Sequence, residues 1–337
     1  MSLETRRILV TGCCGFMGSW IADALVDAGH EVYGVDNLSG GDIENYSGKY
    51  RLFVMDLRDG ARTEELIRSV KPEVVYHTAA CAREGASQFQ PKYVTETNLL
   101  AFMNVIEPAI KYGLEKFIFF SSMAVYGDQK PPFSEDMPRK PVDIYGINKA
   151  AIEQSLEVLA DVHEFDFVTI RPHNAIGERQ SLRDKFRNVV AIFMNRIMRG
   201  EPLYIYGDGE QKRAFSYILD SLPCYVRCLD DDIRNEIINV GGMEPITINE
   251  LADEVCRAMG VDPETYPRVY LPPRPREVKY AWCTWEKSVR LLGYEEKYGW
   301  RKGVWRMAAW AKKKGPQPWT DEKLPLESPK MPKIWRS

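Results

Sequence analysis

Tyr145 and Lys149 lie four positions apart in the stretch Tyr145-Gly146-Ile147-Asn148-Lys149. Residues at this spacing share one face of a helix, so the lysine ammonium is expected near the phenol. A nearby cation favours the phenolate and lowers the pKa of a tyrosine. A tyrosine tuned in this way can act as a general base at neutral pH.

Ser122 directly follows an apolar run and precedes Met123 and Ala124. Its hydroxyl can hydrogen-bond the reacting oxygen and relay a proton. Because Tyr-x-x-x-Lys occurs often by chance, the pair gains weight from Ser122 and from a dinucleotide-binding loop earlier in the chain. We therefore predict that Ser122, Tyr145 and Lys149 are the catalytic residues.

That loop carries Gly12, Gly15 and Gly18, directly after a predicted strand and at the start of a predicted helix. The first glycine permits a tight turn, the second lets backbone approach a pyrophosphate, and the third allows close packing of helix on strand. Backbone N–H groups at the helix N-terminus then face the phosphate charge. The spacing predicts a dinucleotide site.

Asp36 ends the next predicted strand, 24 residues after Gly12. A carboxylate there can accept both ribose hydroxyls of the adenosine and would repel a 2′-phosphate, which favours NAD over NADP. Cys13 and Cys14 within the loop are interpreted as small filling residues, with a reactive thiol beside the pyrophosphate as the alternative.

Two further strand ends complete the predicted cofactor site. Asp56 can hydrogen-bond the adenine amino group or simply form a turn, and the small residues after His77 let the cofactor lie close to the backbone. His77 itself is interpreted as structural. The residues predicted to bind NAD are Gly12, Gly15, Phe16, Met17, Gly18, Asp36, Asn37, Asp56, Leu57, Ala79, Ala80, Asn98, Tyr145 and Lys149.

Alternating strands and helices must position these groups. The patterns predict strands over Arg7–Thr11, Glu31–Asp36, Arg51–Met55, Val74–His77, Lys116–Ser121 and Phe167–Arg171. They predict helices over Gly15–Ala28, Arg62–Val70, Pro91–Tyr112 and Ile144–Val162. This order is typical of an α/β fold with a doubly wound parallel (Rossmann) sheet covered by helices on both faces.

The alternation ends near Arg171, which predicts two domains and a tail. We expect an NAD-binding domain over residues 1–172, rejoined by the chain around 215–242. A smaller mixed α/β substrate-binding domain is expected mainly over 173–312, with a helix Ile248–Met259 that Thr247 and Glu250 cap. Residues 313–337 are rich in proline and are expected to form a loose tail, although Trp319 and Trp335 could dock it.

Composition excludes several classes of protein. The formal net charge of −3 argues against a nucleic-acid binder. No apolar run of about 18 residues predicts a membrane span, and the N-terminus lacks the layout of a signal peptide. Seven cysteines without a Cys-x-x-Cys motif favour reduced thiols, no metal site and a cytoplasmic location.

These motifs together resemble the extended short-chain dehydrogenase/reductase family, in its NAD-dependent sugar epimerase/dehydratase branch. The resemblance covers about residues 6–312. Within this branch, the chain resembles the UDP-glucose and UDP-N-acetylglucosamine 4-epimerases. It implies a nucleotide-sugar substrate, with a pyrophosphate-binding asparagine, two phosphate-binding arginines and a ribose-binding acid. The implied substrate-binding residues are Ser122, Asn174, Tyr206, Arg213, Arg274, Glu277 and Ala281.

The sequence also departs from the family. Sugar 4,6-dehydratases carry an Asp-Glu pair after the catalytic hydroxyl residue, where this chain has Met123-Ala124. The 3,5-epimerising relatives have a cysteine at the position of Ala124. Ala214 replaces the usual Asp after the first arginine, and Arg276 replaces a usual Gly. The first two departures disfavour those reactions, and the last two bear on the substrate.

The resemblance implies a nucleoside-diphosphate-sugar 4-epimerase, an isomerase. Tyr145 would remove the proton of the sugar 4-hydroxyl during transient oxidation at C4 by tightly bound NAD, with hydride return to the opposite face. The alternatives are an NAD-dependent keto-sugar reductase or dehydrogenase, a 4,6-dehydratase, and a dinucleotide sensor without turnover. Net consumption of NADH would separate a reductase from an epimerase.

Two finer expectations follow from the family. The helical patterns Pro91–Tyr112 and Ile144–Val162 correspond to its four-helix dimer interface and imply a homodimer, although by pattern alone they could simply cover the sheet. Ala281 falls where a small residue accompanies tolerance of N-acetylated sugars. The alternative is that Tyr280 or Trp282 fills this space, or that Ala281 faces away.

Overall fold

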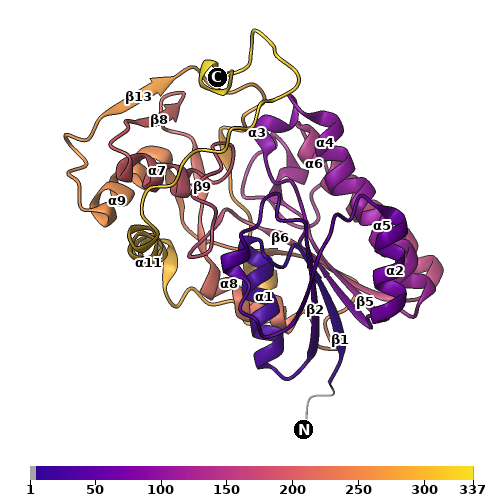
Figure 1. Cartoon of the computed structure of the whole chain (residues 1–337). Coiled ribbons are helices and arrows are strands. Elements are labelled where there is room, and N and C mark those ends of the chain that lie inside the picture. Colours follow the sequence, from indigo (N-terminus) through magenta and orange to yellow (C-terminus); the bar gives the residue numbers. More distant parts are fainter. Residues whose placement is uncertain (1–4, 337) are drawn as a thin grey trace.

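The computed structural model describes residues 5–336 and is built around a seven-stranded parallel sheet (Figure 1). Its strand order is β11-β6-β5-β4-β1-β2-β3, which confirms the predicted doubly wound α/β fold. The strands are β1 (Arg7–Thr11), β2 (Glu31–Asp36), β3 (Arg51–Val54), β4 (Val74–His77), β5 (Lys116–Phe120), β6 (Asp166–Pro172) and β11 (Glu236–Val240).

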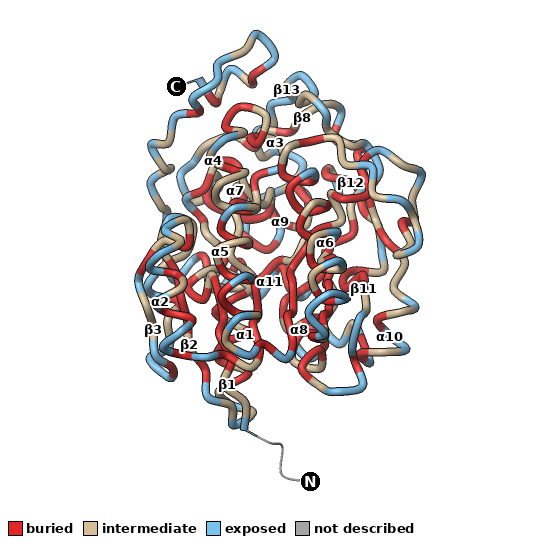
Figure 2. Tube along the Cα trace, turned by 90° about the vertical axis from the view of Figure 1, so that its right-hand side faces the viewer, coloured by how far each residue is buried: buried red, intermediate tan, exposed pale blue. Residues whose placement is uncertain are grey.

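Helices cover both faces of the sheet because its strands are apolar on both sides. One face carries α1 (Phe16–Asp27) and α8 (Ile218–Arg227), and the other carries α2 (Gly60–Val70), α5 (Ala101–Lys111) and α6 (Ile144–His163). The buried residues accordingly follow the sheet and the inner sides of these helices (Figure 2). Within residues 5–336, no helix has both the length and the apolar character that crossing a bilayer requires.

The strand order reverses at β1, which lies between β2 and β4. The connections leaving the carboxyl ends of β1 and β4 therefore run to opposite sides and leave a crevice between them. The glycine-rich turn follows β1, and the Thr78–Ala80 segment follows β4. The fold thus gathers at one edge of the sheet the loops in which the site was predicted.

The predicted helix over Pro91–Tyr112 is interrupted. It consists of α4 (Pro91–Thr95), a π-helical turn (Glu96–Leu100) and α5. Within this turn the Asn98 amide accepts a hydrogen bond from the backbone N–H of Cys81 at 2.7 Å and donates to its carbonyl at 3.3 Å. The extra residue of the π turn fits a side chain that ties this helix to the loop after β4.

A second, smaller group of elements follows β6. Helix α9 (Ile248–Met259) begins at Thr247, and the predicted capping box with Glu250 is present. Apolar side chains of this helix share a buried cluster with those of α7 and α11. The other elements are α7 (Val189–Met198), α11 (Gly299–Lys314), β7 (Ala175–Ile176), β8 (Leu203–Tyr206), β9 (Lys212–Ala214), β10 (Ser216–Tyr217), β12 (Pro245–Thr247), β13 (Arg268–Leu271) and β14 (Tyr280–Ala281). Helix α10 (Glu286–Leu292) packs instead against β11 of the sheet and against α8.

The C-terminal segment, defined as residues 316–336, corrects the prediction of a loose tail. It has little regular structure but lies against the body, and Trp335 is only 4% exposed, among Phe89 and Phe186. Trp319 donates its indole N–H to Glu201 at 3.2 Å. Proline prevents helix formation here, but it does not prevent the burial of large aromatic side chains, which stabilises an extended segment.

Candidate active site

A cavity of about 900 Å³ opens at the carboxyl ends of the sheet strands, between the sheet and the second group of elements. Of the residues predicted to bind cofactor or substrate, all but Asn98 line this cavity. Asn98 instead holds the loop after β4 through its two hydrogen bonds to Cys81. Its contact with the cofactor stays a prediction, and its observed role is to support the cavity wall.

The glycine-rich turn has the features of a pyrophosphate cradle. Gly12 has a φ of 69°, and a Cβ there would lie 2.9 Å from the backbone of Ala79. A Cβ on Gly18 would lie 2.2 Å from the Gly12 carbonyl oxygen. Helix α1 has no side-chain cap and no acidic residue in its first turn, so its first N–H groups are left for an anionic ligand. The turn therefore fits the diphosphate of NAD.

Asp36 lies at the end of β2 beside this turn and is 7% exposed. Its carboxylate accepts backbone hydrogen bonds from Cys14 at 2.9 Å and from Leu38 at 2.7 Å. Burial raises the pKa of Asp36, and these two hydrogen bonds oppose the rise. Each carboxylate oxygen can accept more than one hydrogen bond, so Asp36 retains capacity for ribose hydroxyls.

Asp56 is held by a neighbour that the sequence analysis did not single out. Arg58 donates to both of its carboxylate oxygens, with a shortest distance of 2.7 Å, and Asn37 donates to it at 3.0 Å. The hydrogen bonds from Arg58 lower the pKa of Asp56 to about 2. Asp56 is therefore a charged acceptor with a fixed orientation at the cavity wall.

Cys13 and Cys14 are fully buried beneath the glycine-rich turn. Their sulfur atoms and a carboxylate oxygen of Asp36 lie within 4.8 Å of one another, close enough to hold a metal ion. However, the hydrogen bond with Cys14, together with burial, raises the pKa of the Cys13 thiol. A protonated thiol is a poor nucleophile, so Cys13 fits the interpretation as a filling residue, and Cys14 is equally buried.

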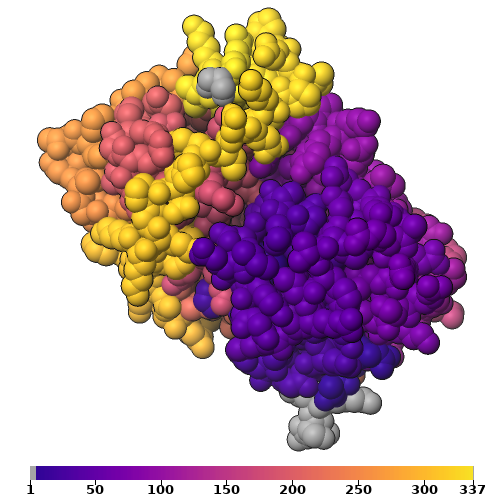
Figure 3. Space-filling model, in the orientation of Figure 1, coloured from indigo at the N-terminus to yellow at the C-terminus, as the bar shows by residue number. Residues whose placement is uncertain are grey.

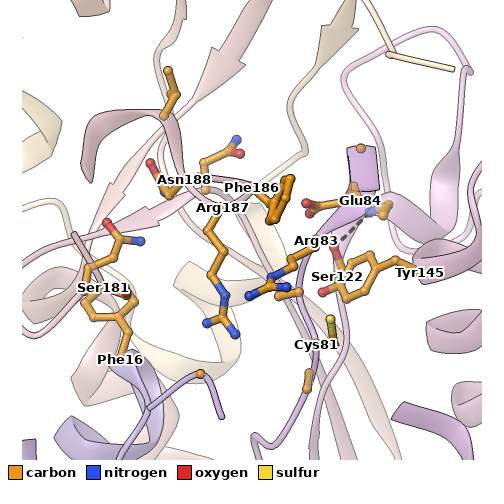
Figure 4. A pocket seen from close by; sticks show the side chains of 18 of the residues that line it. Phe16, Cys81, Arg83, Glu84, Ser122, Tyr145, Ser181, Phe186, Arg187 and Asn188 are labelled. Atoms are coloured by element: carbon orange, nitrogen blue, oxygen red, sulfur yellow. Dashed lines mark hydrogen bonds between the residues drawn. The ribbon is translucent and has the colours of Figure 1, made fainter. Parts of the chain in front are cut away.

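The three predicted catalytic residues converge in the cavity. Tyr145 and Lys149 lie on the first turns of α6, which begins after the capping residue Asp143. Lys149 donates to the carbonyl of Phe120 at 2.6 Å and lies 5.8 Å from the centre of the Tyr145 ring. Ser122, which follows β5, accepts a hydrogen bond from the backbone of Ala124 at 3.1 Å. Figure 4 shows the Ser122 hydroxyl and the Tyr145 phenol pointing toward one another.

The predicted lowering of the Tyr145 pKa by Lys149 is contradicted. Burial raises the pKa of Tyr145 above its usual range, and the Glu84 carboxylate adds to the rise, although the hydroxyl of Ser122 opposes it. Burial also lowers the pKa of Lys149 to about 7, so its ammonium is itself only partly charged near neutral pH. The chain's own groups thus favour the neutral phenol, because both side chains are removed from water.

The opposite part of the cavity carries an amide and a guanidinium group. Asn174 donates its amide N–H to the Ala214 carbonyl at 2.9 Å. Arg213 donates to backbone carbonyls of Lys279, at 3.0 Å, and of Val278. Burial lowers the pKa of Arg213 to about 10, which still leaves it charged at neutral pH. Both residues line the cavity, where they can meet an anion.

The second arginine is fixed by an acid and an aromatic ring. Arg274 donates to both carboxylate oxygens of Glu277, at 2.6 and 3.2 Å, and its guanidinium lies 4.9 Å from the centre of the Tyr206 ring. Between them, Arg276 has a φ of 61°. This left-handed backbone explains why a glycine is usual at that position, and a side chain there costs on the order of 1 kcal/mol.

Ala281 lies in β14 and lines the cavity, whereas Tyr280 is 43% exposed. Ala281 belongs to a buried cluster that includes Val125 and Phe133. Because alanine carries only a methyl group, the wall of the cavity is set back at this point. The structure therefore places the small residue toward the cavity, and Tyr280 does not occupy that place.

The sequence analysis missed several charged and aromatic residues of the cavity. Arg83 and Glu84 follow the loop after β4, and Phe186 and Arg187 precede α7 (Figure 4). Arg83 is 4% exposed and pairs with Asp184 at 2.9 Å. A signal existed for the first pair, since charged residues directly after a buried parallel strand fall at the ligand-binding edge of the sheet.

Comparisons with known proteins agree with this arrangement. The model of the NAD dependent epimerase/dehydratase family matches residues 8–241. The UDP-glucose 4-epimerase of Thermotoga maritima, solved with UDP-glucose, is 33% identical, with a TM-score of 0.86 over 91% of this chain and 99% of its own. The UDP-glucose 4-epimerase of Thermus thermophilus, solved with NAD, is 32% identical, with a TM-score of 0.84 over 90% and 98%.

A third solved structure is similar over the same length. The UDP-N-acetylglucosamine 4-epimerase of Methanobrevibacter ruminantium, in complex with UDP-N-acetylmuramic acid, is 28% identical, with a TM-score of 0.83 over 93% of this chain and 100% of its own.

Proposed function

The chain belongs to the NAD-dependent epimerase/dehydratase family, and on that premise we propose that it is a nucleoside-diphosphate-sugar 4-epimerase. It is an isomerase, its cofactor is NAD, and its substrate class is a nucleotide sugar. The observation that carries the finer proposal is the convergence of Ser122, Tyr145 and Lys149 beside an uncapped helix N-terminus in one cavity.

The cofactor half of the site is assigned from the glycine-rich turn and the ends of β2 and β3. The turn at Gly12–Gly18 and the first N–H groups of α1 would hold the diphosphate, Asp36 the adenosine ribose, and Asp56 the adenine. When bound, NAD supplies a reversible two-electron acceptor and a positively charged ring that favours the phenolate of Tyr145.

Tyr145 is the proposed proton acceptor for the sugar 4-hydroxyl. Ser122 accepts a hydrogen bond from Ala124, so its own O–H remains available to the reacting sugar oxygen. Lys149 lies on the same helical face as Tyr145 and donates to the Phe120 carbonyl. When the Lys149 amine is protonated, its charge stabilises the phenolate of Tyr145. For epimerisation, the 4-keto sugar must turn over within the cavity before Tyr145 returns its proton.

The substrate diphosphate is assigned to the other end of the cavity. Arginine guanidinium groups bind phosphate oxygens with two donors at once, and an amide adds a further donor. Arg213, Arg274 and Asn174 line the cavity and supply these groups. Glu277 fixes Arg274 and is placed to accept a ribose hydroxyl, while Tyr206 offers an aromatic face.

The alternatives differ in what they need from this cavity. A 4,6-dehydratase requires an acid and a base after Ser122, and Met123-Ala124 supplies neither. A reductase or dehydrogenase uses the same three catalytic residues, so geometry does not separate it from an epimerase. The 4-epimerase is favoured over the reductase because the similar solved structures are named as 4-epimerases.

A panel of nucleotide sugars tests the proposal. The purified protein is incubated separately with UDP-, GDP-, CDP- and dTDP-hexoses and N-acetylhexosamines, and the products are identified by NMR. We expect inversion at sugar C4 without added NADH and without net change in the redox state of the cofactor. A product formed only with added NADH would identify a reductase, and loss of water would identify a dehydratase.

We also propose a homodimer formed through α6 and the neighbouring π turn. Ile147, Val158 and Val162 are 49%, 63% and 65% exposed and lie on one side of α6. Leu100, 45% exposed, belongs to the π turn that packs against this helix. Such an apolar surface is costly in water and fits a second copy of the chain. Light scattering after gel filtration should give the mass of a dimer, and Val158→Glu should shift it to that of a monomer.

A further inference from the structure

The C-terminal segment spans both parts of the molecule. On one side, Gln317 and Asn195 exchange two hydrogen bonds, at 2.9 and 3.0 Å. On the other side, the backbone N–H of Leu326 donates to the carbonyl of Phe89 at 3.0 Å. Figure 3 shows the segment, in yellow, lying across the two parts. Its residues Trp319–Asp321 and Ile334–Trp335 line the cavity. The segment therefore closes one side of the candidate site.

Trp335, near the end of the segment, packs in the wall of the cavity. Its indole meets Phe186 edge-to-face at 5.3 Å between ring centres and Tyr206 at 6.2 Å. A Cβ on Gly85 would lie 3.2 Å from Trp335 and 3.3 Å from Arg274. The absence of a side chain at Gly85 is therefore what lets Trp335 and Arg274 approach the same point.

An ion pair with a buried arginine fixes the segment at a second point. Glu322 lies 2.6 Å from a guanidinium nitrogen of Arg83, which is 4% exposed. Arg83 also pairs with Asp184, so it draws together the loop after β4, the loop before α7 and the C-terminal segment. A charged group so deeply buried needs its partners, and loss of either would leave it uncompensated.

We infer that the C-terminal segment is a wall of the substrate site and that Trp335 is a binding residue for the base of the substrate's nucleoside. The inference rests on the proposed function, which places the reacting sugar at Tyr145 and the diphosphate at Arg213 and Arg274. Trp335 lines the cavity beside Arg274 and Tyr206, where the nucleoside must follow the diphosphate. The part of the indole that lines the cavity, beside the Tyr206 ring, offers an aromatic contact for a base.

The test compares Trp335→Ala and Trp335→Phe with Leu326→Ala as matched control. Leu326 belongs to the same segment but is 50% exposed, and its backbone hydrogen bond survives the substitution. Each NAD-loaded protein is titrated calorimetrically with UDP, dTDP, GDP and CDP, and KM and kcat are measured on the nucleotide sugar that the wild type converts.

We expect Trp335→Ala to raise the Kd of the nucleoside diphosphate and the KM of the nucleotide sugar about tenfold, with kcat within about twofold of wild type. Trp335→Phe should recover most of the affinity, and Leu326→Ala should resemble wild type. Unchanged affinity in Trp335→Ala, or a fall in kcat at unchanged KM, would overturn the inference.

A second measurement applies if Trp335→Ala fails to fold, as judged by its NAD content. Hydrogen exchange of wild-type residues 316–336 should slow on addition of the nucleoside diphosphate that binds most tightly in the titration. Unchanged exchange would also overturn the inference. The two proposals fail separately. If the wild type binds nucleoside diphosphates through Trp335 but epimerises no nucleotide sugar, the inference about the C-terminal segment stands and the proposed 4-epimerase activity is refuted.

Discussion

The ammonium group of Lys149 donates a 2.6 Å hydrogen bond to the carbonyl oxygen of Phe120, the last residue of β5. This bond ties the first turns of α6 to the sheet edge from which Ser122 follows. It also fixes a lysine whose pKa burial lowers to about 7. The proposed catalytic residues are therefore positioned by backbone, and their charges depend on the surrounding burial.

Tyr145→Phe should abolish most turnover while the cofactor stays bound. The substitution removes the proton acceptor but keeps the ring that packs with Cys81 and Val94. Positioned acid–base groups contribute roughly 10² or more to rate, so kcat should fall by at least that factor. Turnover is followed by NMR, and NAD is released by denaturation and counted. Epimerisation near the wild-type rate would refute the role of Tyr145.

Asp36→Ala should weaken NAD binding and relax the discrimination against NADP. The carboxylate that would repel a 2′-phosphate is lost, together with the hydrogen bonds from Cys14 and Leu38. Asp36→Asn keeps the shape and removes the charge, so it separates repulsion from loop order. The measurement is the ratio of the affinities for NADP and NAD. Tighter binding of NADP than NAD by the wild type would contradict the assignment.

Glu84→Gln should move the rising limb of the pH profile of kcat/KM to lower pH. The Glu84 carboxylate raises the pKa of Tyr145, and the proposed mechanism requires the phenolate. A neutral amide removes this repulsion, so the phenolate forms at lower pH. Glu64→Gln is the control, because Glu64 pairs with Lys111 on the surface. A limb that stays in place, or moves to higher pH, would show that Glu84 does not act on Tyr145.

Two buried histidines should make the fold sensitive to acid. Burial lowers the pKa of His77 to about 3 and that of His173 to about 4. The unfolded chain binds their protons below about pH 6.5 and the folded chain does not, so stability is present above pH 6.5 and is lost as the pH falls toward 4. The loss is about 1.4 kcal/mol per histidine and pH unit.

Denaturant unfolding at pH 7.5 and 5.5 measures this loss. His173→Asn should show a smaller difference between the two pH values, because one of the two protonation sites is removed. His163→Gln, at an exposed position at the end of α6, should behave as wild type. An unfolding free energy that does not change between these pH values would contradict the prediction.

The sheet and its glycine-rich turn were predictable because their signals are local. Strands Arg7–Thr11, Glu31–Asp36 and Val74–His77 have the predicted bounds, and Thr247 caps α9 as expected. The spacing of Gly12 and Gly18 is visible in the sequence. The structure shows why glycine is needed there, since a side chain at either position would collide with backbone. Periodicity and turn chemistry are carried by neighbouring residues, which a single sequence displays.

Contacts between distant segments were not predictable. Arg83, Arg187 and Asp184 form one cluster only because the loop after β4 meets the loop before α7. Trp335 looks like part of a proline-rich tail until Gly85 and Phe186 provide a surface for it. The prediction of a lowered Tyr145 pKa was wrong for the same reason. The burial that raises this pKa depends on the whole cavity rather than on the spacing to Lys149.

Ala281→Tyr should selectively remove activity on N-acetylated substrates. Ala281 is 5% exposed and lines the cavity, so a tyrosine there would extend into the space set aside for the sugar. An acetamido group is several heavy atoms larger than a hydroxyl, and it would be the first group excluded. We expect the wild type to convert N-acetylhexosamine nucleotides as well as plain hexoses, and the variant to retain only the hexoses.

The matched control is Tyr280→Ala, because Tyr280 is 43% exposed and precedes Ala281 in the same strand. It should leave the ratio of the two kcat/KM values unchanged. A tyrosine at 281 also lies near the buried cluster of Val125 and Phe133, so disruption of the core would lower both activities together. Only a loss confined to the N-acetylated substrate supports steric exclusion. Equal losses on both substrates, or a wild type inactive on N-acetylated sugars, would refute it.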